Sequence, residues 1–496
     1  MYTFSSKLKT FSIILMVLGA IGIGIGFLTA PKDIQDVERI LAESGHGEHD
    51  SVAHVVSTED SHATMNQNDS KVAKIAATST TDNAAVMNID SSMQDSMANT
   101  TPAKIVAEKK VAEISEADAH AEHQEHLEHV LHQLQNKPWS ALYVACIFFM
   151  LIAMGVLSFY AIQIVSQAGW SPVLFRVMHA ITAYLLPGSV IFFILLCLSG
   201  FHVNHMFVWM SDGIIDPASA NYDKLIANKS GYLNVPFWLI RAAIILGGWN
   251  LYRFFTVKFS LKQDEAKDDY YYKRNFKISA GFLVFFIVTE SIMSWDWIMS
   301  LDPHWFSTLF GWYVFASFFV SGITTICLVT LMLKGAGYLP HVNTSHLHDL
   351  AKFIFGMSVF WAYLWFSQFM LIWYANIPEE VTYFITRIEQ YNLPFFGTLV
   401  LNFVFPILIL VNTDFKRITW VLVMAGVVIL LGHYVDFFVM VMPATVGDQW
   451  FIGLSEISSV LFFLGLFVFV VFSAMTKSSL LAERDPFIEE SKHFHY

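Results

Sequence analysis

The sequence predicts an all-α, polytopic membrane protein with ten transmembrane helices. Hydrophobic residues make up 55% of the 496 residues and charged residues only 14%, whereas soluble domains carry about 25% charged residues. Most of the charge also lies outside the long apolar runs, and about 20 apolar residues are what a helix needs to cross the hydrocarbon core. These two observations indicate that lipid surrounds most of the chain.

Ten stretches are long and apolar enough to cross a bilayer. The first follows Lys7 and Lys9, is long for the apolar part of a signal peptide and precedes nine further runs, so we interpret it as an uncleaved anchor. The predicted spans are 11–29, 139–165, 174–199, 233–257, 278–301, 306–333, 350–375, 393–411, 418–442 and 453–475.

Basic residues in the short connections predict the orientation of the spans. If the N-terminus lies in the cytoplasm, the cytoplasmic segments hold sixteen Lys and Arg residues, and the short outer loops hold only Lys224, Lys229 and Arg387. Cytoplasmic loops of membrane proteins carry the excess of Lys and Arg. We therefore expect both termini in the cytoplasm and the long loop at 30–138 on the opposite side.

The loop at 30–138 is polar and rich in His. Its middle lacks aromatic residues and any strong period, which is typical of disorder, and residues 103–135 regain helix formers and predict a helix that leads into the second span. Five His residues recur there at every third position, at 120, 123, 126, 129 and 132. A metal-binding tract and a solvated helix that uses His as its polar residue both fit this pattern. Steps of three residues drift around a helix, so the five imidazoles do not share one face.

Cysteine and charge patterns exclude several other classes of protein. Cys146, Cys197 and Cys327 lie alone in apolar runs, and no CxxC or CxxCH motif is present, which argues against a zinc ribbon, a Cys-ligated iron–sulfur cluster and covalent c-type haem. A b-type haem needs two His at matching depth, and His179 and His433 differ in predicted depth. The chain has no Lys/Arg-rich tract of the kind that predicts nucleic-acid binding. We expect no cofactor or metal to be bound by this chain.

Charged residues that lie within predicted spans include Arg241, Glu290, Asp296 and Asp436. Each costs about 2.5–3.5 kcal/mol near the middle of a bilayer unless something compensates it. These side chains must therefore face one another, water or a ligand. Because burial favours the neutral form of a carboxyl group, Glu290 is expected to be able to exchange a proton.

Polar residues occur at every depth of the spans, which is what a transmembrane proton path requires. The structural alternative is that Arg241 with an acid, and His433 with Asp436 on one helix face, are buried pairs that fix helix register. We single out no catalytic residue. The candidate proton-path residues are His179, Tyr184, Arg241, Glu290, Asp296, His348, Asp349, Lys352, Tyr363, Gln368, His433 and Asp436.

The segment IMSWDWIMSLDPHWFSTLFGWYVFASFF, from Ile292 to Phe319, carries a family resemblance. It resembles the hairpin between the fifth and sixth spans in the membrane subunits of alternative complex III, the bacterial quinol:electron-acceptor oxidoreductase. These subunits are related to the polysulfide-reductase-type (NrfD-like) membrane proteins. The ten-span layout agrees along nearly the whole chain, and the long loop after the first span is similar to that of the second of the two such subunits.

This resemblance implies two four-helix bundles with two flanking helices. The expected parts are an anchor helix at 1–29, the outer insertion at 30–138, a first bundle at 139–301, a second bundle at 302–442, and a final helix with a cytoplasmic tail at 443–496.

The resemblance also implies a place in the bacterial inner membrane within a multisubunit respiratory complex. Expected partners are a sister NrfD-like subunit, an iron–sulfur subunit and multihaem c-type cytochrome subunits, with a terminal oxidase as a further candidate. Menaquinol or another quinol, the iron–sulfur clusters and the c haems would be bound by those partners.

One departure from the family pattern concerns the quinol site. In the sister subunit the quinol pocket is associated with a His in the second span and an Asp in the fourth. Here the second span has no His, and the fourth has Arg241 but no acid. We therefore expect a structural role and a proton path. The alternatives are a proton-coupled transporter, because Pro187-Gly188 and Pro406 interrupt spans three and eight at corresponding places, and a purely structural anchor.

Overall fold

The computed structural model describes residues 2–44 and 102–495, with the backbone alone described at 43, 44, 102–122 and 125. All regular secondary structure in these ranges is helical. The chain divides into two compact units, one made of residues 1–30 and 133–496 and the other of residues 31–132.

The smaller unit contains α2 (Ile34–Ser44) and the first part of α4 (Pro102–Val165). At the start of α2 the Asp33 carboxylate accepts a hydrogen bond from the Asp36 backbone N–H at 3.0 Å, which satisfies one of the free donors at a helix N-terminus. Helix α4 confirms the helix predicted at 103–135. The predicted disorder of the middle of the loop falls on residues 45–101, outside the described residues.

The larger unit contains the membrane-spanning helices. Ten helices of the described chain are long and apolar enough to cross a bilayer, as the sequence predicts. The ten spans are α1 (Ser6–Thr29), His126–Val165 of α4, Pro172–Gly200, α8 (Val235–Gln263), Tyr270–Leu301, α10 (Phe310–Gly335), α11 (Thr344–Ala375), Asn392–Leu410, α15 (Thr419–Val446) and α16 (Leu454–Met475). Helix α9 (Tyr270–Trp297) forms most of the fifth span.

Two of the spans are interrupted. The third runs through η1 (Pro172–Leu174), α5 (Phe175–Ile181), η2 (Thr182–Tyr184) and α6 (Leu185–Gly200). The eighth runs through α13 (Asn392–Leu399), the π-helical η5 (Val400–Val404) and α14 (Phe405–Leu410). A proline removes the hydrogen bond to the carbonyl four residues earlier. The residues four before Pro187 and Pro406 lie in η2 and η5, so the prolines explain both interruptions.

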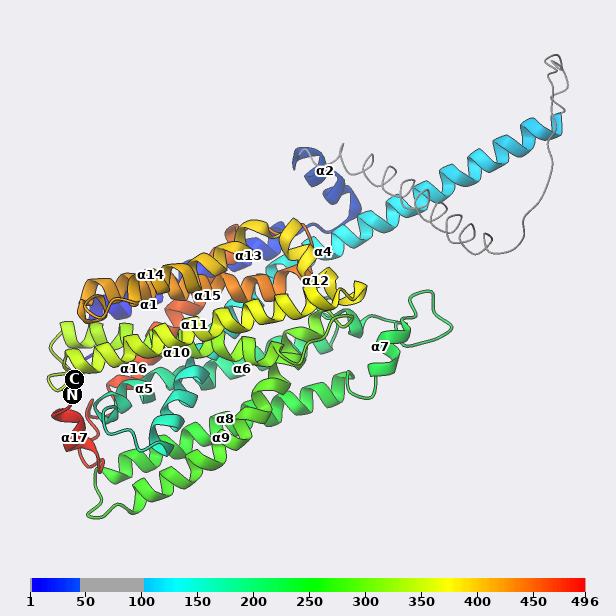
Figure 1. Ribbon diagram of the computed structural model, residues 1–496. Helices are drawn as coiled ribbons and strands as arrows, with labels where there is room; N and C mark the ends of the chain where they lie inside the picture. Colours follow the sequence, from blue (N-terminus) through cyan, green and yellow to red (C-terminus); the bar gives the residue numbers. More distant parts are fainter. Residues whose placement is uncertain (1, 45–101, 496) are drawn as a thin grey trace, which may run out of the picture. The chain divides into compact units, whose positions relative to one another are not determined.

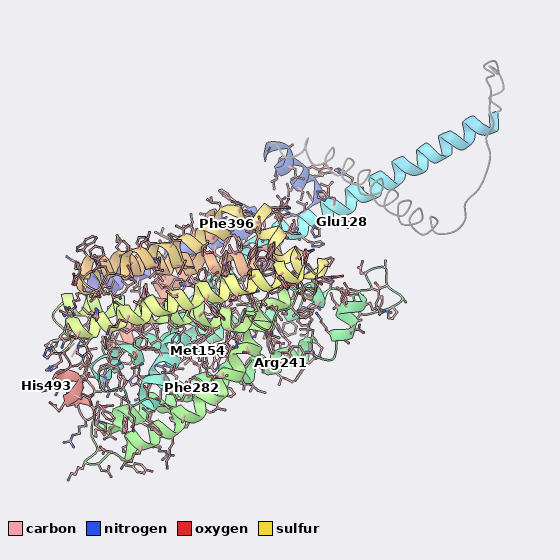
Figure 2. The ribbon with its side chains drawn as sticks, viewed as in Figure 1. Glu128, Met154, Arg241, Phe282, Phe396 and His493 are labelled. Carbon is pink, nitrogen blue, oxygen red and sulfur yellow. The ribbon has the colours of Figure 1, made fainter. Side chains whose placement is uncertain are left out.

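Helices α4 and α10 are the most buried spans and cross each other at two glycines. A Cβ atom on Gly155 would lie 2.5 Å from the Phe318 carbonyl oxygen, and one on Gly322 would lie 2.8 Å from the Val156 backbone nitrogen. Only glycine allows the two backbones to approach this closely. In Figure 2, Met154 lies next to this crossing, among the helices.

The remaining spans pack around these two helices in two groups. In the first bundle α8 packs against α9 and α6, and α4 joins α9 where the Tyr143 hydroxyl donates to the Trp297 carbonyl at 2.7 Å. In the second bundle α10 packs against α11 and α15, and the broken eighth span packs against α11 and α15. Helices α1 and α16 pair with each other at the side, where Gly22 meets Ser458. This is the predicted arrangement of two bundles and two flanking helices.

Both chain termini lie at one end of the larger unit, which we call the termini end (Figure 1). The Tyr2 ring packs against Tyr338 with centroids 4.9 Å apart, and Asn343 donates to the Phe494 carbonyl at 2.5 Å. The short α17 (Ile488–Lys492) lies there as well, as does His493 (Figure 2). The connections predicted to be cytoplasmic meet at this end, so the termini share a side with most of the basic residues.

The opposite end carries the connections predicted to lie outside. They include α7 (Lys224–Lys229) before α8, and α12 (Pro378–Glu389) between the seventh and eighth spans. Asp223 caps α7 through its carboxylate and also contacts His304 at 2.6 Å. Bonding to His304 and to the α7 backbone lowers the pKa of Asp223.

Candidate functional site

Arg241 and Asp296 form a buried ion pair between α8 and α9 (Arg241 is labelled in Figure 2). Arg241 Nε lies 2.7 Å from Asp296 Oδ2, and Nη2 lies 3.1 Å from Oδ1. The guanidinium also donates to the Tyr232 carbonyl at 3.0 Å and lies over the Tyr232 ring. Such two-point contacts are strong and directional. Arg241 thus pairs with an acid, as in the structural alternative to a proton path, and the pair fixes α8 against α9.

Glu290 lies two turns before Asp296 on α9, and its residue is only 4% exposed. Its carboxyl oxygens accept hydrogen bonds from Ser294 Oγ at 3.1 Å and Ser291 Oγ at 3.2 Å. Within the described chain Glu290 belongs to no ion pair. Ser291 faces Gly311 of α10, so Glu290 lies near the junction of the two bundles. A lone carboxylate is costly there, and two hydroxyl partners suit a carboxyl group that carries and releases a proton.

Asp436 on α15 is the centre of a second buried group, which we call the Asp436 cluster: Tyr313, Ser317, Trp361, His433 and Asp436. The Tyr313 hydroxyl donates to Asp436 Oδ1. Ser317 Oγ and Trp361 Nε1 donate to Oδ2 at 2.8 and 2.9 Å. The three donors come from α10 and α11. No Lys or Arg forms an ion pair with Asp436 among residues 2–44 and 102–495, so neutral donors alone surround this acid.

His433 extends the cluster by one step. Its Nδ1 lies 2.9 Å from Ser317 Oγ and 3.8 Å from Asp436 Oδ2. Ser317 has one hydroxyl proton and donates it to Asp436, so Nδ1 of His433 must donate to Ser317. In the neutral ring this leaves Nε2 as an acceptor, and Nε2 is buried with no hydrogen-bond partner in the described chain. The cluster is thus an ordered series of groups that can pass a proton.

Asn402 of the π-helical η5 lies beside this series. Its side chain is completely buried, and neither its Oδ1 nor its Nδ2 has a hydrogen-bond partner in the described part of the chain. A Cβ atom on Gly432 would lie 2.1 Å from Asn402 Oδ1, so Asn402 approaches α15 one residue before His433. Buried polar groups normally have partners, and π-helical turns are frequent at functional sites. Asn402 therefore belongs with the candidate site.

Arg387 of α12 lies at the end of the second bundle that is opposite the termini end. It is 4% exposed, lies 3.3 Å from the Tyr383 ring centroid and donates to the Tyr383 carbonyl at 2.9 Å. It forms none of the ion pairs found in the described residues. With Gln368, Tyr383 and Tyr313 it lines a cavity of about 10 Å³, which has room for about one water molecule. Tyr313 connects this cavity to Asp436.

A third polar group occupies the termini end of the first bundle. The His179 ring packs on Tyr160 with centroids 4.6 Å apart, and the Tyr160 hydroxyl accepts from Asn275 Nδ2 at 2.9 Å. His179 Nδ1 lies 3.5 Å from Arg176, which pairs with Asp264. The His179 Nε2 atom has no partner in the described chain.

Asp485 faces this group from the C-terminal tail. Together with Tyr160, Asp264 and Asn275 it lines a second cavity of about 10 Å³. Burial raises the pKa of Asp485 to about 6. A carboxyl group with a raised pKa thus lies at the termini end of the first bundle.

The other predicted residues are scattered. Tyr184 is buried beside Phe467 of α16, and its hydroxyl has no partner among the described residues. On α11, Asp349 pairs with Lys352 at 2.7 Å and lies 3.9 Å from the buried His348. Tyr363 is 63% exposed on the outward face of α11. The twelve candidates therefore form several separate groups, and only some of these are joined by hydrogen bonds.

Several functional candidates were not predicted from the sequence. Tyr313, Ser317 and Trp361 contact Asp436 from other helices, and Arg387 was counted only as an outer-loop residue. One available signal was the spacing of Tyr313, Ser317 and Ser321, each four residues apart on one face of the sixth span. Nothing in the sequence indicated that Arg387 would be buried.

The geometry of the described residues bears on metal and haem binding. In the described ranges no group of three or more His, Cys, Asp or Glu side chains is placed to hold a metal ion. His179 and His433 lie in different bundles, on α5 and α15. The tract that begins at His120 falls partly outside the described side chains.

The fold and the buried groups define a multi-pass, all-α membrane protein. In comparisons with known proteins, no family model and no curated protein matches the chain.

Proposed function

We propose that this chain is a membrane subunit of a bacterial respiratory complex that oxidises quinol and resembles alternative complex III. It holds the complex in the cytoplasmic membrane, with both termini in the cytoplasm, and carries protons through its bundles. A sister subunit oxidises quinol, and iron–sulfur and multihaem c-type cytochrome subunits accept the electrons. The resemblance of the hairpin from Ile292 to Phe319, together with the ten spans in two bundles, supports this assignment.

The observation that carries the proton-path proposal is the Asp436 cluster. An acid held only by neutral donors inside a membrane-spanning bundle can change its protonation state without breaking an ion pair. Intramembrane acids of this kind are typical of proton relays.

The hydrogen bonds suggest the order of the proton transfers. His433 accepts a proton at Nε2 and passes its Nδ1 proton to Ser317, and Ser317 passes its own hydroxyl proton to Asp436. The Tyr313 hydroxyl, which donates to Asp436 Oδ1, then turns to donate its proton toward the cavity at Arg387 and accepts a proton from Asp436 in its place. Each group gains one proton and loses one, so no net charge accumulates. Glu290, on the other side of α10, is a second group able to exchange a proton.

The first bundle supports the inference that quinol is not oxidised in this chain. Helix α8 carries no acidic residue, and the guanidinium of Arg241 is already bound by Asp296. Residues 139–165, the predicted second span, also lack the His that the family associates with the quinol pocket.

The test of the path uses Asp436→Asn in the whole complex, reconstituted into vesicles with quinol and an electron acceptor. We expect the number of protons moved per electron to fall while quinol oxidation continues, because the relay loses the group that takes up the proton. The matched control is Glu379→Gln, an exposed acid on α12, which should change neither quantity. An unchanged proton-to-electron ratio in Asp436→Asn would refute the path.

The test of the assembly is affinity purification of the chain in mild detergent. We expect iron–sulfur and multihaem subunits to co-purify, with the haem absorbance of c-type cytochromes. Purification of the chain as a single species would contradict a role as a subunit.

A proton-coupled transporter is the second candidate function, and the interruptions of the third and eighth spans favour it. Broken spans at corresponding places are typical of transporter binding sites, and Asn402, with no partner in the described chain, lies in one of the interruptions. Proton-driven solute uptake by the chain alone in liposomes would select this function over the first.

A further inference from the structure

A hollow opens on the lipid-facing surface at the termini end, between the start of α1 and the end of α10. It has a volume of about 550 Å³. Thr3, Ser5 and Lys7 lie along its α1 side, and Met332 and Tyr338 lie along its α10 side. This hollow belongs to none of the polar groups described above.

A shallow, open stretch of the α1 surface continues from this hollow toward the middle of the membrane. It is formed by Ser6, Lys7, Thr10, Phe11 and Ile14, all residues of α1. Lys7 and Phe11 also line the hollow. We call the hollow and this stretch together the α1 groove.

The α1 groove is polar at one end and apolar at the other. Hydroxyl groups and the Lys7 ammonium group occupy the end nearest the termini, and Phe11 and Ile14, which are 53% and 50% exposed, occupy the end nearest the membrane interior. Lys7 takes part in none of the ion pairs found in the described residues. An amphiphile with an anionic head and an apolar chain matches this gradient.

Contacts among the described residues hold the wall of the groove in place. The Tyr2 ring packs against Tyr338 and against Phe472 of α16. The hydroxyl groups of Thr3 and Tyr338 lie 3.1 Å apart. The segment before α1 is thus fixed to the end of α10, and the groove does not depend on a ligand to form.

We propose that the α1 groove binds a membrane phospholipid with an anionic headgroup. The headgroup phosphate lies against Lys7 and the neighbouring hydroxyl groups, and one acyl chain lies along Phe11 and Ile14. A lysine near the membrane surface attracts anionic lipid, whereas a zwitterionic headgroup brings its own cation to the phosphate. Charge complementarity therefore selects the anionic class, and the bilayer supplies it at high concentration.

The experiment is native mass spectrometry of the full chain, or of its complex, in mild detergent with equal amounts of dioleoyl phosphatidylglycerol and dioleoyl phosphatidylcholine. We expect phosphatidylglycerol to be retained in preference to phosphatidylcholine. Lys7→Gln should lower its retention about fivefold, the effect of removing one lysine charge near a membrane surface. The matched control is Lys9→Gln, an exposed lysine two residues away that does not line the groove, and it should leave retention unchanged.

Equal losses in both variants, or equal retention of the two lipids, would overturn the proposal. A second measurement places a photoreactive phenylalanine analogue at position 11 in membranes. A cross-link to phospholipid supports the proposal, and a cross-link to another subunit shows that a protein covers the groove. The proposal is independent of the proton path and of quinol chemistry.

Discussion

The two bundles compensate their buried acids in different ways. In the first bundle Asp296 is matched by a full positive charge, the guanidinium of Arg241. In the second bundle Asp436 is matched by three neutral donors, and the nearest ionisable partner is His433 at 3.8 Å. Both arrangements offset the free-energy cost of placing an acidic side chain in the hydrocarbon core.

The difference separates a structural role from a chemical one. An acid bound to arginine cannot lose or gain a proton without leaving an uncompensated charge, so Asp296 mainly fixes two helices. An acid bound to hydroxyl and indole groups can do so, because its donors can also relay protons or reorient. The comparison therefore favours the second bundle for the proposed proton transfer, with Glu290 between the two bundles.

The largest expected effect concerns the crossing that joins the bundles. Gly155→Leu should prevent the two bundles from packing, because even a Cβ at this position would clash with the Phe318 carbonyl. We expect loss of the folded chain from membranes, measured by its recovery as a single species in size-exclusion chromatography. Gly281→Leu on α9 is the control, since nothing lies within 4 Å of a Cβ there. Normal recovery of Gly155→Leu would contradict the crossing.

The next effect compares the two acids directly. Arg241→Ala leaves Asp296 buried without its counter-charge and should cost about 3–5 kcal/mol of stability. Asp436→Asn keeps a polar group among neutral donors and should cost roughly 1–2 kcal/mol. Thermal unfolding in detergent measures both. If the two variants lose stability equally, the distinction between the bundles is wrong.

A smaller effect tests the exit from the Asp436 cluster. Tyr313→Phe removes the hydroxyl that connects Asp436 to the cavity at Arg387. Proton translocation by the complex should fall roughly a hundredfold, at the lower end of what a positioned proton donor contributes, with quinol oxidation retained. Tyr374→Phe, at an exposed tyrosine of α11, should have no effect. A normal proton-to-electron ratio in Tyr313→Phe would place the exit elsewhere.

The smallest effect is a pH dependence at the termini end of the first bundle. The pKa of Asp485 is raised to about 6 in the folded chain, above its ordinary value of 3.8. The folded state therefore holds this proton more tightly than the unfolded state, so tail packing should weaken as the pH rises from about 4 through 6 and then level off. Arg176, Asp264 and Asp269 also act on this carboxyl group.

Hydrogen exchange of the tail, corrected for the intrinsic rate at each pH, measures this dependence. Asp485→Asn should remove it, and Glu483→Gln, an exposed acid two residues away, should retain it. If the protection of the tail is the same at pH 5 and pH 8, burial does not raise the pKa of Asp485.

The contacts of the buried charged residues could be predicted better from the sequence for the first bundle than for the second. The need for an acid beside Arg241 follows from the cost of a lone charge, and the spacing of His433 and Asp436 places both on one face of a helix. The roles of Tyr313, Ser317 and Trp361 could not be predicted, because they depend on how α10 and α11 are rotated toward α15. Arg387 was missed because a connection between spans gives no signal of its burial.

The amino-acid sequence by itself determined the number of membrane helices, their order and approximate positions in the chain, and which side chains require compensation. These properties depend on local composition, because the free energy of moving a segment from water into hydrocarbon is approximately a sum over its residues. Only the tertiary structure decided which partner each buried charge receives, because that choice depends on the rotation and close approach of helices far apart in the chain. The crossing at Gly155 and Gly322 sets that approach for the two bundles.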